Sequence, residues 1–560
     1  MKLTGAQVII KCLLEHGVDT VFGYPGGQVI PLYNALYDSS LKQVLPVHEQ
    51  GAIHAADGYA RASGRTGVCI ATSGPGATNI VTGLATAYMD SVPIIAITGQ
   101  VPTHQIGRDS FQEIDIVSVT LAITKHSFQV TDVEKLPQVI RAAFAIANTG
   151  RSGPVLIDIP SDIQLAELEY MPPEQTTTVE KQPIELTAQV MAGIKAAGKV
   201  LKEAKRPVLL VGGGIIRAEV SKQVVAFAEK IGIPVVSTLM GLGGFPANHP
   251  QFLGLTGMHG HVSANKTVVD SDVVIAIGSR FSDRVTGNRG CYAAEKTVIH
   301  IEIDPSEVDK NIAVEIPLVG DIGAITDLLT AELTNQTYYD WCQCVQGWRE
   351  QYATHYETEG FNAPWIMHYV SKQMQEQPVI FVTDVGQNQL WAAQHLTINQ
   401  PRTWITPGGC GTMGFGLPAA LGAQLAVPAS RVIHIAGDGG FKMTGMELVT
   451  VVNEQLPLIS IVLNNRSLGM VRQWQQLFYQ ARYSATLLPD FDFVGFVTSC
   501  GAEGATVNTK QEFQMIFEQA LSSTKPFVII VNIATQDIVT PMIAPGAKLN
   551  EYVDAGCKLE

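Results

Sequence analysis

Short apolar runs of about five residues alternate with amphipathic stretches along most of the chain. In the first third, such runs occupy residues 68–72, 94–98 and 154–159. Runs that are apolar at every position, rather than at every second one, are typical of strands covered by helices on both faces. The pattern therefore predicts an α/β fold built on parallel sheets.

The same alternation returns twice further along the chain. A second block opens with the run 207–211, and a third block opens with 379–383. A polar stretch at 172–183 predicts a linker, and an aromatic, charged stretch at 334–365 predicts a helical connector. We therefore expect three consecutive doubly wound parallel-sheet domains and a short tail, bounded at 1–170, 185–335, 365–540 and 541–560. Within the blocks, further strands are predicted at 273–278 and 298–303.

Composition limits the classes of protein that the chain can belong to. Its 560 residues exceed what one hydrophobic core usually holds. Hydrophobic residues make up 46% and charged residues 16%, which is typical of a folded globule and not of a disordered chain. The net charge is −14, and no cluster of Lys and Arg could follow a phosphate backbone. We therefore expect no binding to nucleic acid.

The cysteines and the N-terminal segment indicate a cytoplasmic protein. Eight cysteines are scattered along the chain, and only Cys342 and Cys344 lie close together. We expect reduced, mostly buried thiols. The first residues lead directly into an amphipathic helix, and no window is long and apolar enough for a membrane span. The sequence thus predicts no membrane association.

The segment 435–476 places polar residues directly after two apolar runs. The first run ends in a Gly-Asp-Gly turn at Asp438, and the second, 458–463, ends in a pair of asparagines that includes Asn465. Between them, residues 445–454 predict a helix, which makes the segment a strand–helix–strand unit. Both polar points then lie at carboxyl ends of strands, where ligands bind in open α/β sheets.

The side chains at these two points suit a divalent cation. Asp438 and Asn465 offer hard oxygen ligands, and a backbone carbonyl near Ser467 together with phosphate oxygens would complete a Mg²⁺ shell. Neighbouring glycines would let backbone N–H groups approach the phosphates. Gly-Asp-Gly is also a common turn, so two unrelated turns are the alternative interpretation.

The two motifs together resemble the diphosphate-binding motif of thiamine diphosphate enzymes. Two stretches of the first block, HEQGAIHAADGYAR (48–61) and SGPGATN (73–79), are similar to the pyrimidine-domain signature of the same superfamily. The resemblance implies pyrimidine-binding, central FAD-binding and diphosphate-binding domains in that order. It also implies that Glu49 hydrogen-bonds N1′ of the aminopyrimidine, while the cofactor carries its own base. From the residues alone, Glu49 could equally be an acidic residue in a helix's first turn.

The resemblance implies further contacts with the cofactor. Those of the first block would reach across a subunit boundary, so the functional unit is at least a dimer: Gly26, Thr72, Pro75 and Asn79. Those of the third block are Val385, Gly386, Gln387, Asn388, Gly411, Thr412, Met413, Gly437, Gly439, Gly440, Leu468, Gly469 and Met470. Met443 matches the apolar wedge that bends the cofactor, although a methionine is often simply a core residue.

Within the superfamily, the chain is most similar to acetohydroxyacid synthase catalytic subunits, over essentially its whole length. The motifs that carry this similarity are FGYPGG (22–27), TGQVP (98–102), DSFQE (109–113), TGMHG (256–260), SRFSDRVTGN (279–288) and GMVRQWQ (469–475). The implied reaction decarboxylates pyruvate and adds the resulting carbanion to pyruvate or 2-ketobutyrate, in branched-chain amino acid (isoleucine, valine and leucine) biosynthesis. Trp474 and Arg284 would contact the acceptor, whereas Phe111 and Gln112 would approach from the other subunit. Trp474 could instead be an ordinary aromatic residue on a helix face.

The central block resembles the FAD site of this family, in which the flavin is mainly structural. The matching positions are Arg151, Gly212, Gly213, Gly214, Thr238, Leu239, Met240, Gly257, Met258, His259, Gly278, Arg280, Ser282, Glu302, Ile303, Gly320 and Asp321. Taken alone, a triple-glycine turn is common among nucleotide folds. Two positions depart from the family, which commonly has aspartate at Ser282 and lysine at Ser161.

Several alternatives stay open at this point. A pyruvate-oxidase-type oxidoreductase shares ThDP, FAD and the domain order, and a catabolic acetolactate synthase shares the reaction. Glyoxylate carboligases lack the glutamate that Glu49 supplies, and a non-catalytic scaffold would not need Glu49, Asp438 and Asn465 together. We expect a homodimer or homotetramer, and a small regulatory subunit is a candidate partner.

Overall fold

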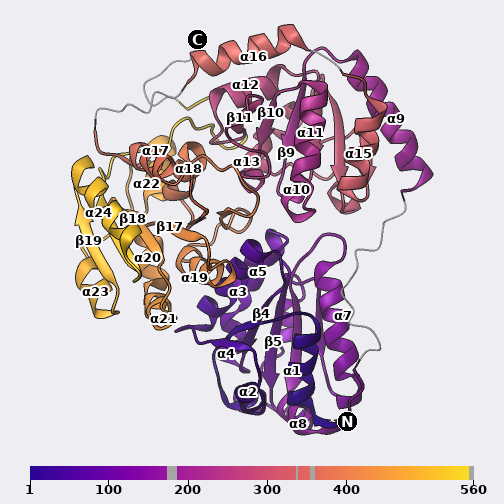
Figure 1. Ribbon diagram of the computed structural model, residues 1–560, viewed down its shortest axis with the longest axis vertical. Helices are drawn as coiled ribbons and strands as arrows, with labels where there is room; N and C mark the ends of the chain where they lie inside the picture. Colours follow the sequence, from indigo (N-terminus) through magenta and orange to yellow (C-terminus); the bar gives the residue numbers. More distant parts are fainter. Residues whose placement is uncertain (173–185, 336–337, 354–359, 554–560) are drawn as a thin grey trace.

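A computed structural model of the chain describes residues 1–172, 186–335, 338–353 and 360–553. The predicted linker falls almost wholly outside the described residues. Three parallel sheets of six strands follow one another along the chain, each with helices on both faces (Figure 1). The α/β fold with three doubly wound sheets is therefore confirmed.

The first sheet has the strand order β3-β2-β4-β5-β7-β6. Its strands are β2 (Thr20–Gly23), β3 (Lys42–Val44), β4 (Gly67–Ala71), β5 (Ile94–Gln100), β6 (His126–Gln129) and β7 (Val155–Pro160). The helices around it are α1 (Gly5–Glu15), α2 (Ile30–Tyr37), α3 (Glu49–Ser63), α4 (Pro75–Asn79), α5 (Val81–Met89), α6 (Ile116–Thr120), α7 (Leu136–Asn148) and α8 (Ser161–Leu165). An antiparallel pair, β1 (Lys2–Thr4) and β8 (Glu167–Glu169), ties the two ends of this domain together.

The central sheet has the order β11-β10-β9-β12-β13-β14. Its strands are β9 (Pro207–Val211), β10 (Val235–Ser237), β11 (Phe252–Leu255), β12 (Val273–Ile277), β13 (Thr297–Glu302) and β14 (Ile316–Val319). Its helices are α9 (Ala188–Glu203), α10 (Gly214–Arg217), α11 (Ser221–Ile231), α12 (Val262–Asp270), α13 (Asp283–Thr286), α14 (Arg289–Tyr292) and α15 (Ile322–Glu332).

The third sheet has the order β16-β15-β17-β18-β20-β19. Its strands are β15 (Val379–Thr383), β16 (Trp404–Ile405), β17 (Arg431–Gly437), β18 (Ile459–Asn464), β19 (Glu503–Val507) and β20 (Phe527–Asn532). Its helices are α17 (Ala363–Gln373), α18 (Gln387–His395), α19 (Gly416–Ala426), α20 (Asp438–Thr444), α21 (Leu448–Asn453), α22 (Gly469–Phe478), α23 (Phe493–Ser499) and α24 (Lys510–Ser522).

Two helical predictions need correction. The helix expected at 445–454 is preceded by another, α20, which begins at Asp438 itself, and a 3₁₀ turn at Gly445–Glu447 separates α20 from α21. Gly437 is extended, so the chain turns helical one residue later. The connector expected at 334–365 is not one helix in the described residues, because α16 (Tyr339–Gln351) and α17 are separate there.

The first and third domains share one hydrophobic core, in which α3 packs against α19 (Figure 1). The two helices cross without side chains between them at two glycines. A Cβ atom on Gly58 would lie 2.0 Å from the carbonyl oxygen of Ala419, and one on Gly422 would lie 1.8 Å from that of Ala55. These glycines therefore permit the close approach of the two helices.

The expectation of mostly buried cysteines is wrong. Among the seven cysteines in the described residues, which all have free thiols, only Cys12 and Cys69 are buried. Cys291, Cys344 and Cys410 are exposed, because α14, α16 and a glycine-rich loop carry them at the surface. The number of cysteines alone could not show which face of a helix each one occupies.

No helix in the described parts of the chain is both long and apolar enough to cross a membrane.

Candidate active site

Asp438 and Asn465 lie at the carboxyl ends of β17 and β18, which are neighbours in the third sheet. The Asp438 side chain is almost fully buried, and its Oδ2 has no hydrogen-bond partner in the described chain. Burial raises the pKa of Asp438 to about 6, against the opposing effect of Lys442. A buried carboxylate oxygen without a donor is costly unless it meets a cation. These residues therefore fit a divalent metal ion.

The Asn465 side chain is held in one orientation by its neighbours. Its Oδ1 accepts hydrogen bonds from the N–H and the hydroxyl of Ser467, both at 3.1 Å. Its Nδ2 donates to Gln387 Oε1 at 3.1 Å, and Gln387 Nε2 donates to Gln473 Oε1 at 3.0 Å. A Cβ on Gly469 would lie only 2.0 Å from Gln387 Oε1, so a larger residue there would displace the Gln387 amide from Asn465. The sequence did not single out Gln473, although it lies beside Trp474 in GMVRQWQ.

Glycines surround this cluster where a diphosphate would need to approach the backbone. Gly386, at φ 115°, precedes α18, and the Oδ1 of buried Asn388 in that helix has no partner in the described chain. A Cβ on Gly440 would meet Asp384 Oδ2 at 2.0 Å. Backbone N–H groups at the starts of α18 and α20 favour an anion at this point. The cradle is therefore suited to phosphate groups.

The loop before α19 lies against the same cluster. Met413 Cε lies 3.5 Å from the Cβ position of Gly439, and Gly411, at φ 66°, faces Val385. Met443, from α20, packs its Cβ near Gly414, yet 60% of its side chain is exposed. Met443 is therefore not a core residue, and its position stays compatible with a role at the cofactor.

Glu49 is the first residue of α3 and forms a second group of predicted residues in the first domain. Its Oε2 accepts a hydrogen bond from Asn79 Nδ2 at 2.9 Å. Thr72 packs against both Gly26 and Gly76, and a Cβ on Gly76 would lie 3.2 Å from Glu49 Oε1. Pro75 begins α4, which carries Asn79. The structure thus brings together Gly26, Glu49, Thr72, Pro75 and Asn79.

The DSFQE segment borders this group. Gln112 has a φ of 61°, and a Cβ on Gly74 would lie 2.9 Å from Gln112 Cβ. Phe111 is 85% exposed. An aromatic side chain so exposed in one chain is the kind of group that a second chain covers.

A cavity of about 2350 Å³ lies where residues of all three domains meet. Its lining contains most of the predicted flavin residues: Arg151, Gly213, Gly214, Thr238, Leu239, Met240, Met258, His259, Gly278, Arg280, Ser282, Glu302, Ile303 and Asp321. Gly212, Gly257 and Gly320 lie outside this lining. A Cβ on Gly212 would lie 2.1 Å from the carbonyl oxygen of Gly278, so Gly212 serves chain packing. The cavity also reaches Val385, Gly386, Gly411, Met470 and Trp474.

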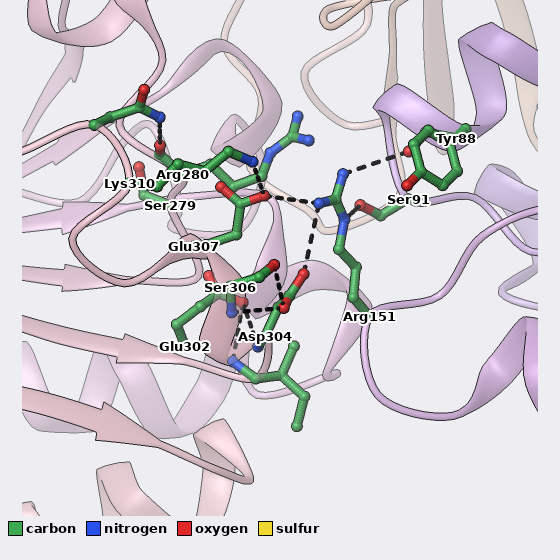
Figure 2. A network of polar contacts seen from close by, with 12 residues as sticks. Tyr88, Ser91, Arg151, Ser279, Arg280, Glu302, Asp304, Ser306, Glu307 and Lys310 are labelled. Atoms are coloured by element: carbon green, nitrogen blue, oxygen red, sulfur yellow. Dashed lines mark hydrogen bonds and ion pairs between the residues drawn. The ribbon is translucent and has the colours of Figure 1, made fainter. Parts of the chain in front are cut away.

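Arg151 enters this cavity from the first domain and joins a network of carboxylates (Figure 2). Its Nη1 donates to Glu307 Oε1 at 2.8 Å and lies 3.6 Å from Asp304 Oδ2, while its Nε donates to Ser91 Oγ at 2.8 Å. The sequence did not single out Asp304 or Glu307. Their signal was the acidic run directly after β13.

Glu302 ends β13 beside this network (Figure 2). Its Oε1 accepts hydrogen bonds from the N–H groups of Ile303 and Asp304, at 2.9 and 3.2 Å. Burial raises the pKa of Glu302 to about 7. An acidic group at a strand end of this kind commonly binds a ribose hydroxyl in dinucleotide folds.

Trp474 and Arg284 meet at the edge of the cavity, from α22 and α13. The guanidinium carbon of Arg284 lies 5.6 Å from the centroid of the Trp474 ring, which is a cation–π contact. Arg284 Nη1 also donates to Met258 Sδ at 2.9 Å. Of the two positions that depart from the family pattern, Ser282 lines the cavity, and Ser161, at the start of α8, does not.

The three sheets and the cluster at β17 and β18 define a thiamine diphosphate enzyme, and family models agree. "Thiamine pyrophosphate enzyme, N-terminal TPP binding domain" matches residues 3–119, the central domain of the same enzymes matches 194–329, and their C-terminal TPP binding domain matches 384–531.

Curated relatives narrow the class. The chain is 45% identical over 555 residues to the acetolactate synthase isozyme 2 large subunit of Escherichia coli, covering 99% of this chain and all of that protein. It is 44% identical over 581 residues to a probable acetolactate synthase large subunit of Methanocaldococcus jannaschii, covering 98% and 95%. Identity to the acetolactate synthase large subunit of Haemophilus influenzae is 41% over 563 residues, covering 99% and 98%. The chain belongs to the acetolactate synthase large-subunit family.

Proposed function

We propose that this protein condenses two molecules of pyruvate, with loss of carbon dioxide, into 2-acetolactate. The observation that carries the proposal is the unpartnered, buried Oδ2 of Asp438 beside Asn465, in a chain that also joins Trp474 to Arg284. Asp438 and Asn465 support a cofactor that is held through a metal ion. Trp474 and Arg284 support recognition of a ketoacid.

The metal is proposed to be Mg²⁺, held by Asp438, Asn465 and the chain at Ser467. All three positions offer oxygen, which is the ligand atom that Mg²⁺ prefers. Thiamine diphosphate, when bound, supplies the electron sink that decarboxylation of a 2-ketoacid requires. Gln387 keeps Asn465 oriented, and Gly386, with no atom closer than 3.9 Å to its Cβ position, supports a close approach of the diphosphate.

Glu49 is proposed to share a proton with the aminopyrimidine ring at its Oε1. Asn79 occupies Oε2, which leaves Oε1 as the oxygen available to a ligand. The absence of side chains at Gly26 and Gly76 lets Thr72 pack beside Glu49. Glu49 therefore acts by holding and moving a proton at a fixed atom.

The acceptor is proposed to lie between Arg284 and Trp474. The Arg284 guanidinium would bind the carboxylate of the acceptor, and the indole would contact its alkyl group. Contact with one extra methylene contributes about 0.8 kcal/mol, which would favour 2-ketobutyrate over pyruvate as acceptor. The product would then be 2-aceto-2-hydroxybutyrate, and both products would serve branched-chain amino acid biosynthesis.

FAD is proposed as a structural cofactor in the large cavity. The supporting observations are the cavity's volume of about 2350 Å³, the close glycine turn at Gly213 and Gly214, and the strand-end carboxylate of Glu302. When bound, the flavin would fill space where the three domains meet. The flavin would thereby hold the three domains together, and it would take no part in a redox step.

The proposal includes a homodimer or homotetramer with sites at the subunit interface. The exposed Phe111 and Met443 support it, because both belong to predicted site groups yet face solvent in one chain. The relatives are called large subunits, which supports a smaller, regulatory partner. We further propose a cytoplasmic location, supported by the free thiols of the seven cysteines that the structure describes.

A product assay tests the function. Enzyme supplied with pyruvate, ThDP and Mg²⁺ should form 2-acetolactate, measured with and without FAD. Formation of acetate with reduction of an added acceptor would show a pyruvate-oxidase-type enzyme instead.

The Trp474→Leu variant tests the acceptor site in the same assay, with pyruvate and 2-ketobutyrate mixed. Loss of the indole contact should shift the product ratio toward 2-acetolactate by about fourfold, corresponding to about 0.8 kcal/mol. Trp348→Leu, on α16, is the control and should leave the ratio unchanged. An unchanged ratio in Trp474→Leu would refute the acceptor assignment.

A further inference from the structure

One loop of the third domain, residues 406–413, lies between the two proposed cofactor regions. Residues 407–411 line the large cavity. On that side the loop is packed against the flavin residues, because a Cβ on Gly408 would lie 2.3 Å from Met240 Sδ. Just before the loop, Trp404 Nε1 donates to the carbonyl oxygen of Leu239 at 3.0 Å.

The same loop also borders the thiamine region. The Cβ position of Gly411 lies 3.7 Å from Val385 Cγ2, and Met413 Cε lies 3.5 Å from the Cβ position of Gly439. Directly after the loop, the N–H of Gly414 donates to Asp384 Oδ1 at 2.9 Å. The loop is thus a wall shared by both proposed cofactor regions, which the large cavity joins at Val385 and Gly411.

The first domain fixes this wall through Asp90, whose side chain is fully buried. Asp90 Oδ1 accepts a hydrogen bond from the N–H of Gly409 at 2.7 Å, and its Oδ2 accepts one from Arg61 Nη2 at 2.9 Å. Arg61 Nη1 in turn donates to the carbonyl oxygen of Thr406 at 2.9 Å. One carboxylate therefore holds the loop directly and through Arg61.

A second contact fixes the far end of the loop. Thr86 Oγ1 and Thr412 Oγ1 lie 2.7 Å apart, and both side chains are buried. Thr86 Oγ1 donates to the carbonyl oxygen of Thr82 at 2.9 Å. A hydroxyl has one hydrogen to donate, so Thr412 must be the donor to Thr86. Thr86 lies in α5 and Asp90 is the residue that caps its C-terminal end, so this end of α5 supports the whole wall.

We propose that Asp90 is a positioning residue that couples the two cofactor sites. The loop contains Gly408, Gly409 and Gly411, so without these contacts its two sides could shift independently of each other. Because Asp90 and Arg61 hold the loop as one rigid unit, a ligand that sets the position of the loop on one side also sets it for a ligand on the other side. Such coupling must be reciprocal. The inference rests on the proposed function, because it requires that both ThDP and FAD bind.

The test measures the dissociation constant of ThDP, at fixed Mg²⁺, for the cofactor-free protein with and without saturating FAD. Tryptophan fluorescence reports ThDP binding, and flavin fluorescence reports the reciprocal experiment. In the wild-type protein FAD should tighten ThDP binding by about tenfold, and ThDP should tighten FAD binding by the same factor.

The coupling is expressed as the ratio of the ThDP dissociation constants without and with FAD. Asp90→Ala should reduce this ratio to near one while each cofactor still binds. Asp158→Ala is the matched control. Asp158 is another buried acid of the first domain, but its side-chain partners Thr98, Gln100 and Gln129 all lie within that domain. Asp158→Ala can therefore lower stability, but it should leave the ratio at the wild-type value.

Thr86→Val and Thr86→Ser keep the proposal testable if Asp90→Ala does not fold. The valine variant loses the hydroxyl and should lower the ratio, whereas the serine variant retains it and should preserve the ratio. The coupling alone would be overturned by a ratio near one in the wild-type protein. It would also be overturned if Asp90→Ala and Thr86→Val both kept the ratio of the wild-type protein. A wild-type protein that binds ThDP but no FAD would overturn the proposed flavin site, and the coupling with it.

Discussion

At the scale of single residues, the site combines groups that are held tightly with atoms that have no partner. Asn465 is fixed by Ser467 and Gln387, whereas Asp438 Oδ2 and Asn388 Oδ1 have no partner in the described chain. Buried polar atoms normally form hydrogen bonds, so exceptions point to a bound ion or ligand. This contrast is what locates the proposed metal and diphosphate at the carboxyl ends of β17 and β18.

Glu49→Gln should slow exchange of the C2 proton of bound ThDP by about a hundredfold or more. A glutamine at this position cannot share a proton with the ring in the same way, while the anchor at Asp438 and Asn465 stays intact. ThDP should therefore still bind. Proton exchange followed by NMR, with ThDP affinity measured in parallel, checks the prediction. The exposed Glu134→Gln in the same domain is the control, and equal exchange rates in both variants would exclude the role.

Asp384 should make the free energy of unfolding depend on pH. Burial raises the pKa of Asp384 to about 7, from about 4 in an unfolded chain. Between these values the folded protein binds more protons, so this group lowers stability as pH rises from about 4 to about 7. Asp384→Asn cannot ionise at this position, so the variant should lack this loss of stability with rising pH.

The thermal midpoints of the cofactor-free wild type and Asp384→Asn, compared across this range, test the effect. The midpoint of the variant relative to wild type should rise between about pH 4 and pH 7 and level off above it. A difference that does not vary with pH would show that Asp384 keeps an ordinary pKa.

Some residues of the candidate site could be predicted from the sequence, and others could not. The strand–helix–strand pattern predicted that Asp438 and Asn465 would lie at the carboxyl ends of strands, because strand ends follow from hydrophobic runs. Gln473, Asp304 and Glu307 were not predicted. Gln473 contacts Gln387 from another helix of the third domain, and Asp304 and Glu307 contact Arg151 of the first domain. These contacts depend on side-chain directions between distant segments, which a local pattern does not contain.

At the scale of elements, strands were predicted better than helices. The strands expected at 207–211 and 379–383 are β9 and β15 at those bounds, and the other predicted strands differ by a residue or two. Fully buried parallel strands are continuous apolar runs, so their ends are visible in the sequence. By contrast, α20 carries Asp438, Lys442 and an exposed Met443, and no apolar periodicity marked its start.

Gly58→Ala should lower stability although it replaces glycine within a helix. Alanine favours a helix by about 1 kcal/mol over glycine, but overpacking costs about 1–3 kcal/mol, and here the new Cβ would meet the carbonyl of Ala419. We expect net destabilisation and a lower thermal midpoint.

Gly347→Ala is the matched control for this prediction. Gly347 lies in α16 with nothing within 4 Å of its Cβ position, so the same substitution should stabilise the protein by up to about 1 kcal/mol. If Gly58→Ala and Gly347→Ala shifted the thermal midpoint by the same amount, the close crossing of α3 and α19 would not limit the size of the residue at position 58.

At the scale of the whole molecule, the predicted residues fall into two groups, one around Glu49 and one around Asp438. Glu49 is bonded to Asn79 of the first domain, whereas Asn465 is bonded to Gln387 and Ser467 of the third domain. Each group carries an exposed apolar side chain, Phe111 or Met443. We propose on this basis that two chains complete each site.

Mixed oligomers of two inactive variants should test this arrangement. If a site takes Glu49 from one chain and Asp438 from the other, Glu49→Gln and Asp438→Ala protomers that exchange freely should recover about a quarter of wild-type activity. Half of the dimers would be mixed, and each would hold one intact site.

Glu49→Gln mixed with Asn79→Ala provides the control. Both changes affect the same group, so every site in a mixed dimer would stay impaired and no activity should return. If the first mixture also recovered none, each site would be contained within a single chain.

The packing of α3 against α19 also has a consequence for synthesis of the protein. Residues 51–62 of α3 are buried, many of them in a core shared with the third domain. On the ribosome, α19 emerges about 360 residues after α3, which at about 5–20 residues per second is a delay on the order of half a minute. Throughout that time the apolar surface of α3 lacks its final partner. We therefore expect the nascent chain, rather than the finished enzyme, to be the form that most needs a chaperone.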